Sequence, residues 1–213
     1  MKNIFFAMIL ALVLSIQNFC AASVTIDETY LDGNDKIRYP VVHMTDSAIE
    51  KKINDIIRNE VELFINGTYR SAENIGAEVG GIVINYDVGS NQAGNTVILS
   101  ILMTESRYYK NAAHPATFLQ ALNFNTGSGT LMDMSYLTDI GSGVKQEEIL
   151  QRLERALVKH CKREGIQLFG DALPLKKLPE TFYWDKNNHV HFVFQQYDIA
   201  PYAAGIIDVD IDE

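Results

Sequence analysis

Histidine and aspartate side chains could carry acid–base chemistry in this sequence, but none of them stands in a familiar catalytic motif. The sequence has no Gly-x-Ser-x-Gly, no His-Glu-x-x-His, no phosphate-cradling glycine loop and no Cys-x-x-Cys. His114 follows two alanines and precedes Pro115, in a connection between two predicted strands. A histidine in such a turn could act as a general acid or base, or it could hydrogen-bond a carbonyl and hold the loop. The sequence leaves both roles open.

The most distinctive segment is Tyr197–Gly205 (YDIAPYAAG), which joins two predicted strands. Tyrosines in a loop supply a large contact area, with a hydroxyl that can read polar partners. The alternative is a structural corner, in which Asp198 caps backbone amides, Pro201 stiffens the turn and Gly205 adopts a positive φ. The catalytic candidates are His114 and Asp198, whereas the predicted binding residues form a larger set: His114, Tyr197, Asp198, Pro201, Tyr202 and Gly205.

Two further histidines, His189 and His191, stand two residues apart in a predicted strand, so their rings project from the same face. Two imidazoles could begin a metal site, but no third ligand follows at a set spacing. We therefore expect an exposed pair of side chains without a metal, and no sequence motif requires another cofactor.

The N-terminus has the pattern of a secretory signal peptide. Lys2 precedes an uninterrupted apolar run from Ile4 to Ile16, and small residues follow at Cys20–Ala22. Cleavage is predicted after Ala22, which makes residues 1–22 the signal peptide and residues 23–213 an extracytoplasmic domain, either periplasmic or secreted. The apolar run is shorter than the roughly 18–20 residues that a membrane-spanning helix needs. An uncleaved anchor is the alternative, and no membrane span is expected in the mature chain.

The charge of the chain limits its partners. The whole chain has 18 basic and 27 acidic residues, and cleavage removes only Lys2, so the mature chain has a formal charge of −10. This charge argues against nucleic acid and anionic lipid as partners and favours a cationic one. Cys161 is the one thiol left after cleavage, and we expect it to be buried in a helix.

The elements that position these residues are mostly strands. Two helices are predicted by apolar residues at spacings of three and four. The first is capped at Thr45 or Asp46 and ends at Asn66–Gly67. The second opens near Ser142–Gly143 and closes at Gly165. Predicted strands with short connections cover residues 24–31, 36–44, 77–88, 96–105, 116–126, 130–134, 181–184, 189–195 and 206–211. The sequence therefore predicts an α+β fold with a mostly antiparallel sheet and two main helices, as a single compact domain or two packed lobes.

Four short motifs, taken in the order in which they occur, resemble the RsiV-like extracytoplasmic domain family. They are YPVV at Tyr39–Val42, AAHP at Ala112–Pro115, NFNTG at Asn123–Gly127 and YDIAPYAAG at Tyr197–Gly205. The last segment is the specific one. The sequence departs from the family pattern at Asn111, where a glycine is expected, so the shape of that loop is open.

The resemblance implies an extracytoplasmic α+β domain without known catalysis. In the lysozyme-sensing anti-sigma factor that gives the family its name, such a domain binds lysozyme, and a similar one precedes the catalytic domain of some peptidoglycan deacetylases. Signalling needs a cytoplasmic part, and deacetylation needs a metal-binding domain, for which no residues remain in this sequence. The resemblance therefore implies binding alone, of a cationic protein such as lysozyme or of a cell-wall glycan.

Three functions follow as hypotheses. The first is a stand-alone binding domain of the bacterial cell envelope. The second is an envelope hydrolase that uses His114 as base and Asp198 as its orienting group or as an acid, which requires the two side chains to converge. The third is a structural or assembly protein. The sequence leaves the oligomeric state and the identity of the ligand open.

Overall fold

The computed structural model describes residues 23–89, 94–95, 98–138 and 145–212. The predicted signal peptide, residues 1–22, lies outside the described residues, and so does the predicted opening of the second helix at Ser142–Gly143. Within the described residues, no helix is long and apolar enough to cross a membrane.

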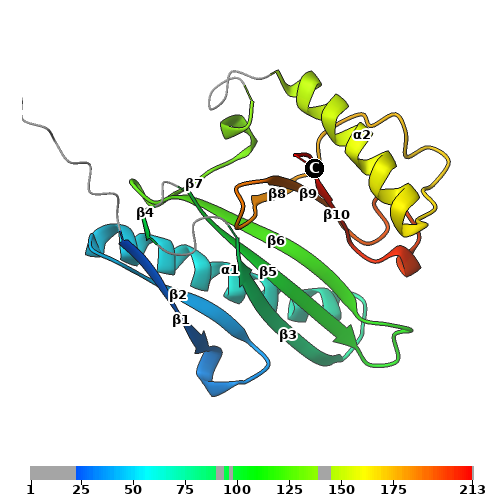
Figure 1. Ribbon diagram of the computed structural model, residues 1–213. Coiled ribbons are helices and arrows are strands. Elements are labelled where there is room, and N and C mark those ends of the chain that lie inside the picture. Colours follow the sequence, from blue (N-terminus) through cyan, green and yellow to red (C-terminus); the bar gives the residue numbers. More distant parts are fainter. Residues whose placement is uncertain (1–22, 90–93, 96–97, 139–144, 213) are drawn as a thin grey trace, which may run out of the picture.

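The first lobe contains two sheets and the long helix α1, Ser47–Asn74 (Figure 1). The predicted hairpin is confirmed: β1, Ser23–Tyr30, pairs antiparallel with β2, Arg38–Met44, and the short 3-10 turn Leu31–Gly33 connects them. The small strand β4, Gly94–Asn95, pairs with the other side of β1. Pro40 therefore lies in an edge strand, as expected of a residue that has no N–H to donate.

The larger sheet of this lobe has the antiparallel order β3-β5-β6-β7. Alternate residues of β5 point toward α1 and are buried, and with Ile53, Ile57 and Val61 of the helix they form the first core. The same face of β5 continues beyond this core with Glu105 and Arg107. The strands have the bounds Val79–Val88, Ile98–Tyr109, Ala116–Asn125 and Thr130–Leu131.

Helix α1 begins where the sequence predicts and ends later. The Asp46 side chain accepts hydrogen bonds from Ala48 N at 2.9 Å and Ile49 N at 3.1 Å, which confirms the N-cap. The predicted end at Asn66–Gly67 is wrong. The buried face continues to Thr68, which is fully buried, and to Ala72, so packing carries the helix past the glycine.

The second lobe consists of α2, Gln146–Glu164, packed over a three-stranded antiparallel sheet of order β10-β9-β8 (Figure 1). Gly165 closes α2 in the left-handed region, with φ +68°, as predicted. Cys161 is buried in this helix, which confirms the expectation, and burial raises the pKa of its thiol. The strands have the bounds Thr181–Trp184, Val190–Phe194 and Ile207–Asp210.

A buried polar network joins the two lobes. Ser100 of β5 donates to the Asn123 side-chain oxygen at 2.8 Å, and Asn123 donates to the Phe182 carbonyl at 2.7 Å. Trp184 N donates to Ser100 Oγ at 3.1 Å. A Cβ at Gly89 would lie 2.2 Å from the Trp184 carbonyl oxygen, so only glycine permits this approach. The lobes form one compact α+β domain, and the predicted fold class is confirmed.

Candidate binding cleft

A cleft of about 780 Å³ lies where the two lobes meet. The first lobe contributes side chains from α1, β5 and β6, and the second contributes the segment between α2 and β8 together with the end of β9. Aromatic and charged side chains both line it, including Phe64, Glu105, Arg107, Phe118, Phe169 and Lys176. A concave, partly apolar surface with a few polar groups is the usual form of a ligand-binding site.

Glu105 lies at the inner end of the cleft because strand alternation points it toward α1. It follows Leu99, Ile101 and Met103 on the same face of β5, and 4% of its surface is exposed. Its Oε1 atom is buried without a hydrogen-bond partner. Burial, and secondarily the negative charge of Glu60 on α1, raise the pKa of Glu105 to about 8. This side chain is therefore a neutral carboxylic acid at pH 7.

Arg107, two residues further along β5, is held by aromatic rings. Its guanidinium carbon lies 5.1 Å from the ring centroid of Phe118 and 5.7 Å from that of Tyr109. Phe118 in turn packs edge-on against Phe64 of α1, with centroids 6.3 Å apart. The Arg107 Nε atom is buried without a hydrogen-bond partner, and in the described part of the chain no carboxylate lies within ion-pair distance of this guanidinium. The cleft thus contains a cation that contacts two aromatic rings and forms no ion pair with any described residue.

The opposite wall of the cleft is tied to the second lobe. Leu175 N donates to the Glu154 side chain of α2 at 2.7 Å, and Phe169 N donates to the Ile199 carbonyl at 2.8 Å. Lys177 forms an exposed ion pair with Glu180 at 3.8 Å. These contacts hold an otherwise irregular segment against the body of the protein.

The predicted binding segment Tyr197–Gly205 lies at one end of this wall, and Asp198 lines the cleft. The Asp198 carboxylate accepts a hydrogen bond from Gln195 N at 2.7 Å, so it caps its own turn. Gly205 has φ +72° and ψ −157°, a conformation that is essentially restricted to glycine. Pro201 precedes the short 3-10 turn Tyr202–Ala204. The structural corner that the sequence left open is therefore present at Asp198 and Gly205.

The two tyrosines of this segment gather around His114. The His114 ring stacks on Tyr202 with centroids 3.7 Å apart, and its Nε2 atom lies 3.5 Å from the Tyr197 hydroxyl. Tyr202 donates to the Pro115 carbonyl at 3.1 Å, and His114 Nδ1 lies 3.0 Å from the same oxygen. We call His114, Tyr197 and Tyr202 the aromatic patch. Tyr197 is 57% exposed, so the patch offers an open surface.

The structure does not join the two catalytic candidates. In the described residues, no hydrogen bond or ion pair connects His114 with Asp198, and each has partners of its own. The loop before His114 contains Asn111 at φ +68°, in the left-handed region that asparagine tolerates better than most residues. This explains how the chain accommodates an asparagine where the family resemblance predicts a glycine.

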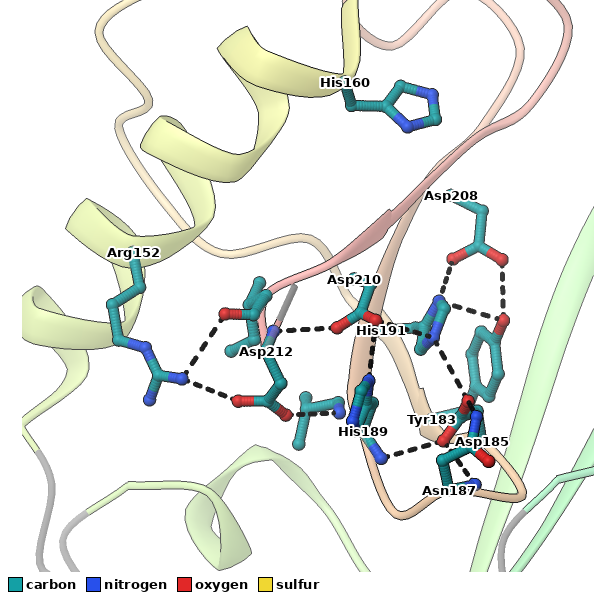
Figure 2. Close-up of polar contacts among 12 residues, drawn as sticks. Arg152, His160, Tyr183, Asp185, Asn187, His189, His191, Asp208, Asp210 and Asp212 are labelled. Carbon is teal, nitrogen blue, oxygen red and sulfur yellow. Dashed lines mark hydrogen bonds and ion pairs between the residues drawn. The ribbon is translucent and has the colours of Figure 1, made fainter. Parts of the chain in front are cut away.

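The expectation of an exposed histidine pair is wrong, because His189 and His191 are half-buried and belong to a network of aspartates on the second lobe (Figure 2). His189 Nδ1 lies 2.8 Å from Asp210 Oδ2, and His191 Nδ1 lies 2.9 Å from Asp208 Oδ1. Tyr183 donates to Asp208 Oδ2 at 2.6 Å, and its ring stacks on His191 with centroids 4.7 Å apart. Tyr183 lies in β8, His191 in β9 and the two aspartates in β10, while His189 directly precedes β9, so the network links the three strands.

The electrostatics of this network favour charged histidines. The hydrogen bond to Asp210 raises the pKa of His189. Burial lowers the pKa of His191, but the hydrogen bond and charge of Asp208 and the charge of Asp210 outweigh it, so the net direction is upward. Among the residues that the structure describes, no group of three or more His, Cys, Asp or Glu side chains is arranged to hold a metal. We interpret this network as structural.

Sequence reasoning missed Glu105 and Arg107. The sequence pattern that could have indicated them is the alternation along the strand. In the run Leu99–Arg107 every second residue is apolar up to Met103, and the same face then continues with Glu105 and Arg107. A charged pair on a face that is otherwise buried indicates a site or a lobe boundary.

Residues 136–212 match the family described as "Protein of unknown function (DUF3298)". This region contains α2, β8, β9, β10 and the segment Tyr197–Gly205. The structure of a DUF3298 family protein from Pseudomonas aeruginosa PAO1 resembles this chain at a TM-score of 0.54 and 12% identity, covering 89% of both chains. A DUF3298 family member from Bacteroides fragilis NCTC 9343 shows 17% identity over 88% of both chains, at a TM-score of 0.48. None of the curated proteins matches the sequence. The comparisons therefore show that residues 136–212 are similar to a family of unknown function, and that the chain shares its fold with the Pseudomonas protein.

Proposed function

We propose that this protein is an exported binding domain of the bacterial cell envelope, and that its cleft between the lobes recognises a peptidoglycan-type glycan. The observation that carries the proposal is the cleft itself, whose volume of about 780 Å³ suits a short oligosaccharide. The N-terminal signal-peptide pattern supports export, because it predicts that residues 23–213 act outside the cytoplasm.

The lining of the cleft fits a ligand with apolar faces and polar edges. Phe64, Phe118 and Phe169 supply apolar surface, and Phe169 is 39% exposed, so its ring is available to a ligand. Gln120, Lys176 and Asp171 supply amide, cationic and anionic groups along the same cleft. Sugar rings present C–H faces and hydroxyl edges, which match such a mixed surface.

The resemblance to the RsiV-like domain supports binding over catalysis. Its specific segment, Tyr197–Gly205, borders the cleft through Asp198 and falls inside the matched DUF3298 region. The alternative hydrolase would need His114 and Asp198 to act together, and the contacts of the described residues offer it no support.

A cationic protein such as lysozyme is the second candidate ligand, and the aromatic patch favours it. Tyr197, Tyr202 and His114 form an open surface of large, amphipathic side chains, of the kind that protein interfaces use. The chain has a formal net charge of −9 at pH 7, which would accelerate encounter with a cationic partner.

Calorimetry with the purified protein tests both candidates. The glycan probe is the tetrasaccharide of alternating N-acetylglucosamine and N-acetylmuramic acid, and the protein probe is a cationic lysozyme at low and at moderate salt. The cleft variant is Phe169→Ala, and its matched control is Tyr69→Ala, an exposed aromatic on α1 outside the cleft. The patch variant carries Tyr197→Ala and Tyr202→Ala.

We expect one-to-one binding of the tetrasaccharide that weakens at least tenfold in Phe169→Ala and is unchanged in Tyr69→Ala. Lysozyme binding that survives moderate salt and is lost in the patch variant would establish the second candidate instead, because screening removes non-specific attraction. Absence of binding to both probes would refute the proposed function.

A further inference from the structure

Two side chains at the inner end of the cleft have polar atoms that the described protein groups do not satisfy. They are Oε1 of Glu105 and Nε of Arg107, both buried and both without a hydrogen-bond partner among the described residues. Glu105 as a whole is 4% exposed. An unsatisfied buried polar atom costs about 1–3 kcal/mol, so two of them lining one cleft suggest a partner that is supplied by a ligand.

The positions of the two side chains suit one shared partner. They stand two residues apart on the same face of β5, and a strand rises about 3.3 Å per residue, so their Cβ atoms are about 7 Å apart. Phe118 and Tyr109 fix the plane of the Arg107 guanidinium. A guanidinium presents a planar fork of donors that matches a carboxylate, and a neutral Glu105 carboxyl group can donate its O–H.

We propose that the cleft recognises a carboxylate of its glycan ligand, bound by the Arg107 guanidinium and by the carboxyl O–H of Glu105. The inference rests on the proposed function, because it names the chemical class of ligand that the same cleft selects. In a peptidoglycan-type glycan, this group is the carboxylate of the lactyl ether on the muramic acid unit. An unmodified N-acetylglucosamine chain lacks it.

The charges around Glu105 favour a carboxylate over an ammonium group. An ammonium ligand would face the Arg107 cation and would need an ionised Glu105, which burial and the charge of Glu60 oppose. A bound carboxylate would itself keep Glu105 protonated, so the donor is maintained in the complex. Other charged groups line the outer part of the cleft: Asp171, Lys176, Lys177, Glu180 and Asp198. Lys177 and Glu180 pair with each other, and Asp198 accepts from Gln195 N.

The test compares two tetrasaccharides of equal length by calorimetry at pH 7. One alternates N-acetylglucosamine with N-acetylmuramic acid, and the other is the N-acetylglucosamine tetramer. We expect the muramic acid probe to bind at least tenfold more tightly, since charge-assisted hydrogen bonds between a guanidinium and a carboxylate are among the strong ones. Arg107→Gln should bring the two affinities within about twofold, whereas Glu73→Gln, an exposed carboxyl change on α1, should leave the preference in place.

A pH series separates recognition from a structural role. Between pH 7 and pH 9 the wild-type preference for the muramic acid probe should fall at least fivefold, because Glu105 then ionises beside the ligand carboxylate. Glu105→Gln keeps a donor that does not titrate, so its preference should be flat over this range. A merely structural Glu105 would not make the preference depend on pH.

The outcomes distinguish this inference from the function on which it rests. Equal affinity of the wild type for both tetrasaccharides would refute carboxylate recognition and leave glycan binding standing. Binding of neither probe would refute both. The comparison of the two probes needs only the wild-type protein, so it decides the question even if Arg107→Gln does not fold.

Discussion

Replacing Glu105 with glutamine should make the protein more stable at high pH and should hardly change it near pH 4.5. Glutamine has nearly the same shape but carries no proton that titrates. The pKa of Glu105 is raised from 4.5 to about 8 in the folded protein, chiefly by burial and then by Glu60. In the unfolded chain the same carboxyl group has its ordinary pKa.

The sign of the effect follows from proton linkage. Between pH 4.5 and pH 8 the folded protein holds the Glu105 proton and the unfolded chain does not, so unfolding releases a proton and rising pH destabilises the folded state. At 1.36 kcal/mol per pH unit, the loss accumulates to about 5 kcal/mol above pH 8. This is a large part of the 5–15 kcal/mol that typically stabilises a domain.

Urea unfolding of the wild type and Glu105→Gln at five pH values from 4.5 to 9 measures the difference. We expect the variant to gain stability relative to the wild type progressively, reaching several kcal/mol at pH 9, with equal m-values. Glu73→Gln on the exposed side of α1 is the control and should follow the wild type. Parallel stability curves for the wild type and Glu105→Gln would refute the argument.

Three further predictions concern other parts of the structure. The stabilisation from His189 and His191 should be complete below about pH 6.5 and should be lost as pH rises through their raised pKa values. Asp208→Asn should lower the pKa of His191 in an NMR titration, and an unchanged His191 pKa would contradict the network. Gly205→Ala should destabilise the protein by about 1–3 kcal/mol in urea unfolding because φ is +72°, whereas Gly170→Ala, with open space and no positive φ, should be near neutral. Ser100→Ala should cost about 1–3 kcal/mol, because it leaves the Trp184 N–H without its acceptor at the junction of the lobes; a melting temperature equal to the wild type would show that the junction does not depend on this bond.

The pattern of apolar residues was enough to predict the fold class. Apolar residues at helical spacing mark the buried face of a helix, and apolar and β-branched runs mark buried strands. The predicted bounds of the strands Thr181–Trp184 and Ala116–Asn125 differ from the observed ones by one residue at most, because aromatic and other apolar residues are enriched in both. The end of α1 was not predictable in this way. Asn66–Gly67 has the composition of a helix stop, but Thr68 and Ala72 are buried beyond it, and this tertiary burial outweighs the local preference.

The candidate site was predictable only in part. The segment Tyr197–Gly205 stood out by composition, and its turn chemistry at Asp198 and Gly205 follows from residue type. The contact of His114 with Tyr202 could not be derived, because 87 positions separate Tyr202 from the loop that it reaches. The cleft depends on how the lobes pack. This packing brings residues such as Phe118 and Phe169 to the same cleft, although no local sequence pattern connects them.

Glu105 and Arg107 combine a cost to stability with a position at the bottom of a cleft. A buried carboxyl group that destabilises the folded state above pH 4.5 would be replaced at little cost by an apolar residue, if packing were its only role. The urea unfolding series and the binding series over pH therefore have to be considered together. If Glu105→Gln is more stable at high pH and also removes the pH dependence of ligand preference, the same carboxyl group accounts for both. If it is more stable while the preference is unaffected, the burial of Glu105 serves the junction of the lobes, and the carboxylate must be recognised elsewhere in the cleft.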